Sequence, residues 1–322
     1  MRRAVALAFT SLIAVAAVAG CGSSAASSSH SASASAPAAD TYTSVTATGT
    51  FDKAPTVTIP AKTGSGALYT KTLIQGTGAK LTSSESLLGN FVMYDWSGKT
   101  HKLIGSTYTQ GIPTLFSGQL LPGLETALIG QKVGSRVLAV IPPADGFGTA
   151  GNSEIGVGAK DTVVFVVDML QTINNTAAVP GKQTYSGGGA LPTVTAGAAG
   201  KAPTITIPKT AAPTTLQVKP LIKGTGPVVK KGQLVVVQYT GVIWRTGKVF
   251  DSSWSRSEPF STPIGEGQVI PGWDTGLVGQ TVGSRVMLVI PPKDGYGSAG
   301  SSQAGIKGTD TLVFVVDILS AS

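Results

Sequence analysis

The chain contains two copies of one sequence unit, and this repeat constrains its fold more than any other feature. Residues 53–60 read KAPTVTIP, and residues 201–208 read KAPTITIP, 148 positions later. A longer stretch, 133–151, recurs at 282–300 with an offset of 149. Solenoid proteins repeat every ~20 to 50 residues. The much longer period of this chain therefore indicates two independent domains of one fold. A length of 322 residues suits two domains, since a domain commonly has about 100 to 200.

Three runs in the second copy have the composition of β-strands. Residues 234–240, 285–290 and 311–318 are rich in β-branched and aromatic side chains and are bounded by Gly, Pro and Asp. One short amphipathic helix is predicted from Pro271, with Asp274 in its first turn. Several strands and one short helix predict an antiparallel α+β fold for each copy.

The composition excludes several classes of active site. The chain has one Cys and two His, too few for a structural zinc site or a disulfide framework. His30 lies in a Ser/Ala tract, which leaves only His101 for acid–base chemistry that depends on His. The sequence has no cluster of Lys and Arg interleaved with aromatic residues, the pattern expected of nucleic-acid binding. We therefore expect no metal, no cofactor and no nucleic-acid partner.

The first 20 residues are typical of an export signal. Arg2 and Arg3 precede an apolar, Ala-rich run that is too short for a good membrane span. The run ends in VAGC, which resembles the lipobox of bacterial lipoproteins, and Cys21 is the only cysteine of the chain. We expect residues 1–20 to be a signal peptide and a lipid on Cys21 to anchor the chain to the bacterial cell membrane, outside the cytoplasm. Ordinary cleavage of a secreted protein is the alternative.

Composition also predicts the domain boundaries. Residues 21–52 would be the lipid anchor and a Ser/Ala-rich tether, because such a stretch buries too little apolar surface to fold. Residues 176–213 are rich in Gly, Ala, Pro and Thr, as linkers are. The sequence therefore predicts a first domain with an N-terminal extension at residues 53–175 and a second domain at residues 214–322.

Several motifs of the second copy occur in a fixed order. They include YTG at 239–241, GKVFDSS at 247–253, GQVIPGW at 267–273 and GYG at 295–297. Together, over about residues 221 to 320, they resemble the FKBP-type peptidyl-prolyl cis-trans isomerases. The resemblance implies a curved antiparallel sheet wrapped on a short helix, with a pocket between them in which X-Pro bonds are isomerised.

The resemblance also implies which residues form the prolyl pocket. Trp273 would be its floor, and Asp251, the Tyr296 hydroxyl and the backbone N–H of Ile270 would be its polar contacts. The apolar walls would be Tyr239, Phe250, Ile270 and Phe314, with Phe260, Val269 and Ile306 as further substrate-binding residues. Ser301 stands where the family often has His.

An apolar pocket of this kind suits prolyl isomerisation. The X-Pro barrier of ~18 to 20 kcal/mol comes from amide resonance. A site that desolvates the imide and holds its twisted form lowers this barrier by differential binding, without a nucleophile. Taken singly, these aromatic residues would more often be core residues, and Asp251 could cap a turn. Two GxGxxG matches, at 146–151 and 295–300, open no apolar helix, so we do not interpret them as dinucleotide sites.

The first copy lacks most of the pocket residues. Leu124 stands at the position of Trp273. Phe147 stands at the position of Tyr296, and Phe91 at the position of Tyr239. The counterpart of the pocket aspartate is ambiguous among Lys102, Gly105 and their neighbours, none of which is acidic. We predict an FKBP-like fold over residues 82–171 with little or no isomerase activity, used to hold substrate or as a spacer.

The sequence thus predicts a lipid-anchored folding catalyst outside the cytoplasmic membrane. Its partners would be unfolded or exported polypeptides that contain proline, and the membrane through the lipid on Cys21. A macrolide-type ligand would fit the same pocket. The competing hypothesis is a non-enzymatic chaperone or substrate-holding surface module.

Overall fold

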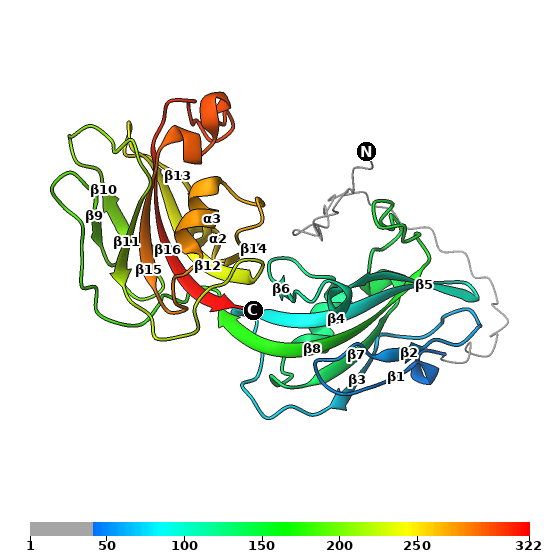
Figure 1. Ribbon diagram of the computed structural model, residues 1–322. Helices are drawn as coiled ribbons and strands as arrows, with labels where there is room; N and C mark the ends of the chain where they lie inside the picture. Colours follow the sequence, from blue (N-terminus) through cyan, green and yellow to red (C-terminus); the bar gives the residue numbers. More distant parts are fainter. Residues whose placement is uncertain (1–40) are drawn as a thin grey trace, which may run out of the picture. The chain divides into compact units, whose positions relative to one another are not determined.

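In the computed structural model, which describes residues 41–322, the chain is built mainly of antiparallel β-strands (Figure 1). Residues 41–82, 89–111 and 119–171 form one compact unit. Residues 83–88, 112–118 and 172–322 form the other. The first 40 residues, which include the predicted signal peptide, Cys21 and most of the tether, lie outside the described residues. No helix of the described part is long and apolar enough to cross a membrane.

The second unit is organised by one sheet. Its strand order is β11 (Gln217–Ile222), β15 (Arg285–Ile290), β16 (Leu312–Ala321), β12 (Leu234–Ile243) and β13 (Val249–Ser252), and β14 (Phe260–Pro263) also pairs with β12. All these pairs are antiparallel. Two short helices accompany the sheet, α2 (Ser253–Arg256) and α3 (Pro271–Leu277). The predicted α+β fold, with a short helix on an antiparallel sheet, is confirmed.

Helix α3 lies close on the sheet because two of its residues have no side chain. A Cβ atom on Gly272 would lie 2.6 Å from a methyl carbon of Ile290, and one on Gly276 would lie 2.6 Å from a methyl carbon of Leu288. Pro271 occupies the first turn, where its missing N–H costs no helical hydrogen bond. The Asp274 carboxylate accepts the N–H groups of Gly265 at 2.6 Å and Gly267 at 2.8 Å, which ties the preceding loop to the helix.

Both faces of this sheet are covered, so every residue of β15 is buried. On the inner face, Val286, Leu288 and Ile290 pack in the core cluster that contains Trp273. Alternate residues point to the outer face, where Met287 and Val289 form a second cluster with Val194, Ile205 and their neighbours. This outer cluster lies under the hairpin of β9 (Thr193–Thr195) and β10 (Thr204–Thr206), on the side of the sheet away from α3 (Figure 1).

The structure of residues 176–213 therefore differs from the expected linker. The repeated KAPTITIP segment supplies β10, and its apolar side chains are partly buried against the sheet. The indole N–H of Trp244, on the outer face, donates to the carbonyl of Thr210 at 3.3 Å. The Gly and Pro residues of this segment lie mainly in the turns of the hairpin. Its alternate apolar residues are buried only because they pack on the sheet below.

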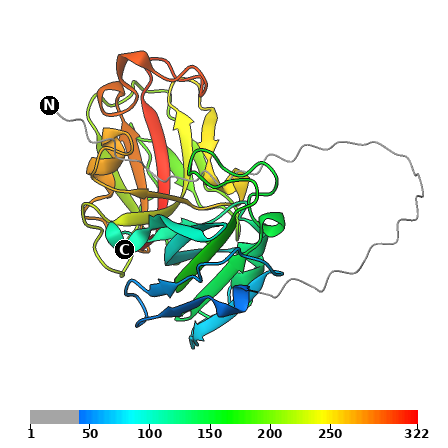
Figure 2. The ribbon, with the colours of Figure 1, turned by 90° about the vertical axis from the view of Figure 1, so that its right-hand side faces the viewer.

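The first unit repeats this plan. Its sheet has the order β3 (Tyr69–Ile74), β7 (Arg136–Ile141), β8 (Thr162–Asn174), β4 (Glu85–Ser97) and β5 (Thr100–Ser106), β6 (Thr114–Phe116) also pairs with β4, and the helix is α1 (Pro122–Leu128). The start of β4 and all of β6 belong to this sheet by strand pairing, although the ranges 83–88 and 112–118 group with the other compact unit. The hairpin of β1 (Thr46–Thr48) and β2 (Thr56–Thr58), drawn in blue in Figures 1 and 2, packs in one cluster with Trp96, Leu138 and Val164.

The folded part of this unit begins before residue 52, where the sequence predicts the end of the tether. Tyr42 is buried, and its hydroxyl lies 2.8 Å from the Thr162 hydroxyl. Residues 41–52 thus form part of the folded unit, because the hairpin that they begin covers the outer face of the sheet.

A buried ion pair recurs at the same place in both units. Arg136 donates two hydrogen bonds to Asp168, at 2.7 and 2.6 Å, and Arg285 donates two to Asp317, at 2.6 and 2.7 Å. Each aspartate also accepts a backbone N–H from the segment that precedes its domain, from Asp52 at 2.7 Å in the first unit. The equivalent donor in the second unit is Val179, at 3.1 Å. The pair therefore fastens the N-terminal extension of each unit to its sheet.

Candidate functional site

Five aromatic rings meet on the inner face of the second unit. The ring of Trp273 lies 5.3 Å from Tyr239 and 5.3 Å from Phe314, with interplanar angles of 85° and 87°. Phe260 lies 5.8 Å from Tyr239 at 76°, and Phe250 lies 5.4 Å from Phe314 at 88°. These are edge-to-face arrangements. They stabilise aromatic pairs by more than the burial of apolar area alone provides. We call these five residues the aromatic cluster.

The structure brings the other predicted pocket residues to the same place. Ile306 is buried in the same core, while Val269 and Ile270 pack against it and stay partly exposed. Ile270 is the residue before α3, and its carbonyl accepts the Trp273 N–H at 2.9 Å. Tyr296 is 40% exposed, and it lies near enough to Asp251 for that charge to raise the pKa of Tyr296. The functional role of each residue remains a prediction.

Local chain geometry explains this convergence. The aromatic cluster draws on β12, β13, β14 and α3, which follow one another along the chain, and on the last strand, β16. On β12 the odd-numbered residues face the helix, so Tyr239 points into the cluster. Gly241 of the same strand pairs with Phe314 on one side and Asp251 on the other. This register places the aspartate beside the rings.

Asp251 is held by two donors. The Tyr239 hydroxyl donates to one carboxylate oxygen, and Arg256 donates to the other at 2.5 Å. Arg256 also donates to the Tyr239 hydroxyl oxygen at 3.1 Å, with its guanidinium carbon 5.9 Å from the centre of that ring. Burial acts to raise the pKa of Asp251, but the hydrogen bonds from Tyr239 and Arg256 outweigh it and hold the pKa below its ordinary value. The carboxylate is therefore ionised at neutral pH.

The two tyrosines keep their protons. Burial raises the pKa of Tyr239, and its hydrogen bond to Asp251 raises it further. Burial and then the negative charge of Asp251 raise the pKa of Tyr296 as well. Among the described residues, no three His, Cys, Asp or Glu side chains are placed to hold a metal ion. The site thus combines packed apolar rings with polar groups whose charge does not change near neutral pH.

The floor of the cluster has one uncommitted donor. Trp273 is 4% exposed, and its indole N–H has no hydrogen-bond acceptor among the described residues. The rings of Tyr239 and Phe314 stand nearly perpendicular to the indole at 5.3 Å. Contact with neighbouring π-faces can partly replace a conventional acceptor for such an N–H group.

Sequence reasoning missed Arg256. The residue lies five positions after Asp251, and the single turn of α2 brings it back to that carboxylate. Ser257, which follows α2, has a φ of 50° and turns the chain sharply. A cation shortly after the aspartate was the only available signal, and the spacing alone does not show that a helical turn intervenes.

The first unit resolves the uncertain counterpart of Asp251. Met93 pairs with Gly105 as Gly241 pairs with Asp251, and both strand pairs are irregular at the next residue. Gly105 is therefore the counterpart, and this position carries no side chain. The ring of Phe91 lies 6.0 Å from Phe165 with an interplanar angle of 38°.

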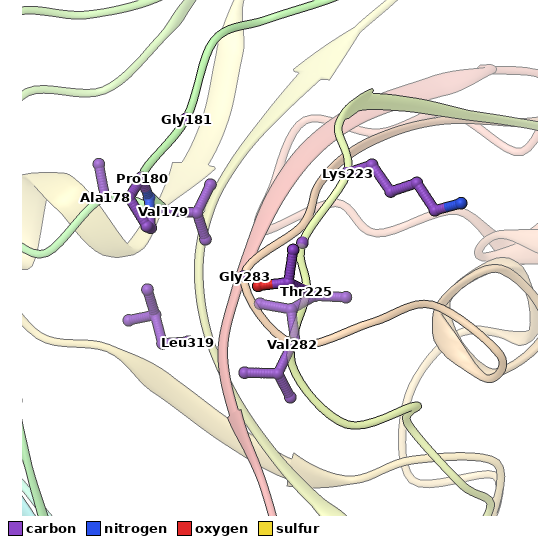
Figure 3. Close-up of a pocket in the computed structure, with 11 residues that line it drawn as sticks. Ala178, Val179, Pro180, Gly181, Lys223, Thr225, Val282, Gly283 and Leu319 are labelled. Carbon is purple, nitrogen blue, oxygen red and sulfur yellow. The ribbon is translucent and has the colours of Figure 1, made fainter.

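A cavity of about 380 Å³ opens elsewhere in the second unit (Figure 3). Residues 178–181, 223–225, 282–283 and 318–319 line it, and none of them belongs to the aromatic cluster. Its walls are mainly apolar, and Lys223 is its one charged lining residue. Because this cavity has no combination of groups suited to a reaction, the aromatic cluster is the better candidate site.

Both copies resemble known proteins. The family model for FKBP-type peptidyl-prolyl cis-trans isomerases matches residues 83–170 and 226–319. An FK506-binding protein of Streptomyces anulatus is 42% identical over 118 residues, which cover 37% of this chain and 95% of that protein. Peptidyl-prolyl cis-trans isomerase FKBP9 of Homo sapiens is 29% identical over 202 residues, 63% of this chain and 29% of that protein. The crystal structure of FkpA from Escherichia coli has 41% identity, covers 34% of this chain and 49% of that chain, and has a TM-score of 0.31.

Proposed function

The chain belongs to the family of FKBP-type peptidyl-prolyl cis-trans isomerases, and we propose that its second copy carries the activity, at the aromatic cluster. The proposal is supported by two features that lie together there. Five aromatic rings meet mostly edge to face, and one carboxylate beside them is held by two donors. The substrates are X-Pro bonds of unfolded or exported polypeptides. The first copy, which has Gly105 in place of the aspartate, does not catalyse.

The proposed mechanism is desolvation of the imide with stabilisation of its twisted form. The proline ring lies on Trp273, between the other rings, where no water competes for the imide. As the C–N bond twists, its nitrogen loses conjugation and the carbonyl loses amide character. The Tyr296 hydroxyl and the Ile270 N–H orient the substrate carbonyls, and Asp251 supplies a fixed negative charge beside the twisting bond. Interactions that strengthen in the twisted form lower the barrier without any proton transfer.

The pocket also fits ligands other than peptides. The Streptomyces relative is named for binding FK506, and we extend that class of macrolide ligand to the aromatic cluster of this chain. Such a ligand would occupy the same enclosure as the proline ring and compete with it. FK506 therefore serves as a probe of pocket occupancy that does not depend on turnover.

Isomerisation of a tetrapeptide that contains Leu-Pro tests the function. We expect the full chain to accelerate cis–trans exchange, and Trp273→Leu to remove most of the effect. Phe147→Leu, at the Tyr296 counterpart of the first copy, is the matched control and should leave the rate unchanged. If the folded full chain does not accelerate exchange, the chain is instead a holding module. If Phe147→Leu lowers the rate as much as Trp273→Leu, the activity does not belong to the second copy.

The location of the protein is a separate proposal that rests on residues 1–21. We propose that Cys21 is lipidated and anchors the chain outside the cytoplasmic membrane, since it is the only cysteine and ends a signal-like segment. In cells, Cys21→Ala should abolish incorporation of labelled fatty acid and move the protein from the membrane fraction to the soluble fraction. Ser24→Ala is a nearby control. Continued labelling of Cys21→Ala would contradict the proposal.

A further inference from the structure

Tyr239 lies at a gap in the pairing of β12. This strand pairs with β14 over residues 234–237 and with β13 over residues 240–242, so Gln238 and Tyr239 lie between the two partner strands. A serine side chain fills the gap, because the Tyr239 N–H donates to Ser253 Oγ at 2.8 Å. This hydroxyl takes the place that the carbonyl of a neighbouring strand has elsewhere in the sheet.

The hydroxyl of Ser253 is oriented in turn by Gln238. Ser253 has one hydroxyl proton, which it donates to Gln238 Oε1, and the carbonyl of Tyr239 is a more distant acceptor at 3.3 Å. The serine oxygen therefore keeps its lone pairs for the Tyr239 N–H. The amide nitrogen of Gln238 donates to the carbonyl of Asn175 at 2.7 Å. Gln238 and Ser253 are both 0% exposed, so bulk water does not compete for these groups.

Ser253 also belongs to the segment that holds the carboxylate. Asp251 precedes it by two residues and Arg256 follows it by three, and both bind the Tyr239 hydroxyl. Ser253 is the first residue of α2, the single turn that brings Arg256 back. This segment therefore binds Tyr239 at two places, the backbone N–H and the hydroxyl. A shift of Ser253 would change the position of the tyrosine hydroxyl relative to the carboxylate.

The first copy has the hydroxyl but not the orienting amide. Thr107 Oγ1 accepts the Phe91 N–H at 2.8 Å, so the same gap is filled there. Asn90 stands 148 positions before Gln238, as Phe91 does before the tyrosine, but its amide donates to Asp52 at 2.8 Å. The Thr107 hydroxyl donates instead to the carbonyl of Phe91 at 3.3 Å. A hydroxyl at the gap thus serves both sheets, whereas the glutamine accompanies the tyrosine that binds a carboxylate.

We propose that Ser253 and Gln238 are positioning residues of the isomerase site. Gln238 directs the hydroxyl of Ser253, and Ser253 holds Tyr239 in the place where the tyrosine hydroxyl meets Asp251. Neither residue belongs to the aromatic cluster, and both act through Tyr239. This inference rests on the proposed function, and it adds two completely buried residues to the groups on which that function depends.

Substitutions in the full chain test the inference. Ser253→Ala removes the acceptor of the Tyr239 N–H, and we expect kcat/KM for the Leu-Pro tetrapeptide to fall about tenfold or more. Gln238→Met keeps the length of the side chain without its amide and should lower kcat/KM about three- to tenfold. Ser253→Thr supplies the kind of hydroxyl that the first copy uses and should keep kcat/KM within about twofold of wild type.

The pKa of Asp251 reports the position of the tyrosine hydroxyl directly. Burial raises this pKa, but the hydrogen bonds from Tyr239 and Arg256 outweigh burial and lower it. Carbon NMR of the carboxyl group should show the pKa rising in Ser253→Ala and in Gln238→Met, where the tyrosine bond is weakened. Thr107→Ala is the matched control, because it deletes the equivalent hydroxyl from the other copy. It should change neither kcat/KM nor the pKa of Asp251.

A purely structural role would give a different result. If Ser253→Ala and Gln238→Met unfold at lower temperature but keep the wild-type kcat/KM and Asp251 pKa, the inference is overturned. A folded Ser253→Thr no more active than Ser253→Ala would also overturn it. Circular dichroism verifies the fold of each variant, and if Ser253→Ala does not fold, Gln238→Met decides by the same two measurements.

Failure of the proposed function is distinguishable from failure of this inference. If the wild-type chain does not isomerise the tetrapeptide, the function fails, and the pKa of Asp251 alone then decides the inference. A higher pKa in Gln238→Met, with no change in Thr107→Ala, would support it. The same pKa in wild type and in Gln238→Met would overturn it.

Discussion

The two copies share their scaffold and differ on the inner face of the sheet, beside the short helix. Each has the same strand order, an N-terminal hairpin on the outer face, and a buried arginine–aspartate pair that holds the preceding segment. Only the second has the five-ring cluster with an ionised carboxylate. The outer face and the ion pair therefore maintain the fold whichever side chains occupy the inner face, so the residues of the inner face are free to diverge.

A second difference lies beside the last strand. In the second copy Asp310 accepts two hydrogen bonds from Arg245, at 2.8 and 3.0 Å. The first copy keeps the aspartate as Asp161 but has Ser97 in place of the arginine. It also has Asp95, 7% exposed, with one carboxylate oxygen that meets no donor among the described residues. Burial and the neighbouring Asp161 raise the pKa of Asp95 to about 6, and the positive charge of Lys102 opposes this only in part.

The largest effect should come from breaking what the copies share. Arg136→Met and Arg285→Met each leave a buried aspartate without its ion-pair partner, which typically costs about 3 to 5 kcal/mol. Native-state hydrogen exchange should show this loss in β8 for the first variant and in β16 for the second. Lys53→Met, which keeps the backbone carbonyl that Arg136 binds, is a control expected to have little effect. A loss in one copy only would mean that the two pairs are not equivalent.

Next in size is the conversion of the second pocket toward the first. Asp251→Leu, Trp273→Leu and Tyr296→Phe together should lower isomerase activity about a hundredfold or more. Loss of a buried hydrogen-bonding contact typically costs ~1 to 3 kcal/mol, and ~1.4 kcal/mol corresponds to a tenfold change in rate. Isomerisation of the Leu-Pro tetrapeptide measures the loss, with circular dichroism to verify the fold. Full activity in the folded triple variant would show that catalysis lies elsewhere.

A smaller effect, on the pH dependence of stability, is expected in the first unit and not in the second. Native Asp95 holds its proton more tightly than the unfolded chain, whose aspartates titrate near 3.8. Its contribution to the free energy of unfolding is therefore complete below about pH 4 and is lost as the pH rises through about 6, by about 2 to 3 kcal/mol.

Comparison with Asp95→Asn isolates this contribution. Hydrogen exchange in β7 should show a stability difference between wild type and variant that changes from pH 4 to pH 7, with the wild type losing more. The exchange of β15, in the second unit, is the internal control and should not respond to the substitution. A difference independent of pH would show that Asp95 does not titrate in this range.

The last prediction is that isomerase activity does not change with pH near neutrality. The groups of the second pocket keep their charge near neutrality, because the pKa of Asp251 is lowered and the pKa values of Tyr239 and Tyr296 are raised. Turnover by the second copy should therefore vary little between about pH 6 and 8, where an ordinary His titrates. A sigmoidal loss of activity in that interval, with the fold intact, would contradict a mechanism without proton transfer.

Much of the scaffold could be predicted from the sequence because the relevant signals are local. Runs of β-branched and aromatic residues bounded by Gly, Pro and Asp predict β12, β15 and β16 to within a few residues, and Pro271 marks the start of α3. The repeat predicts two copies of one fold, and the family model that matches both halves confirms them. The pocket aromatics could be named in advance because they sit in motifs whose order resembles that of one family.

Tertiary structure alone decided the features that depend on distant partners. Residues 176–213 have the composition of a linker, yet they form a hairpin because an apolar outer face lies beneath it. Gly105 could be matched to Asp251 only through strand register, since an insertion hides the correspondence in sequence. Asp95 meets Asp161, and Arg256 meets Asp251, only after the strands and the turn of α2 are in place. Propensity and periodicity act over a few neighbouring residues, whereas burial and the pKa of a carboxyl group depend on whatever the fold brings beside it.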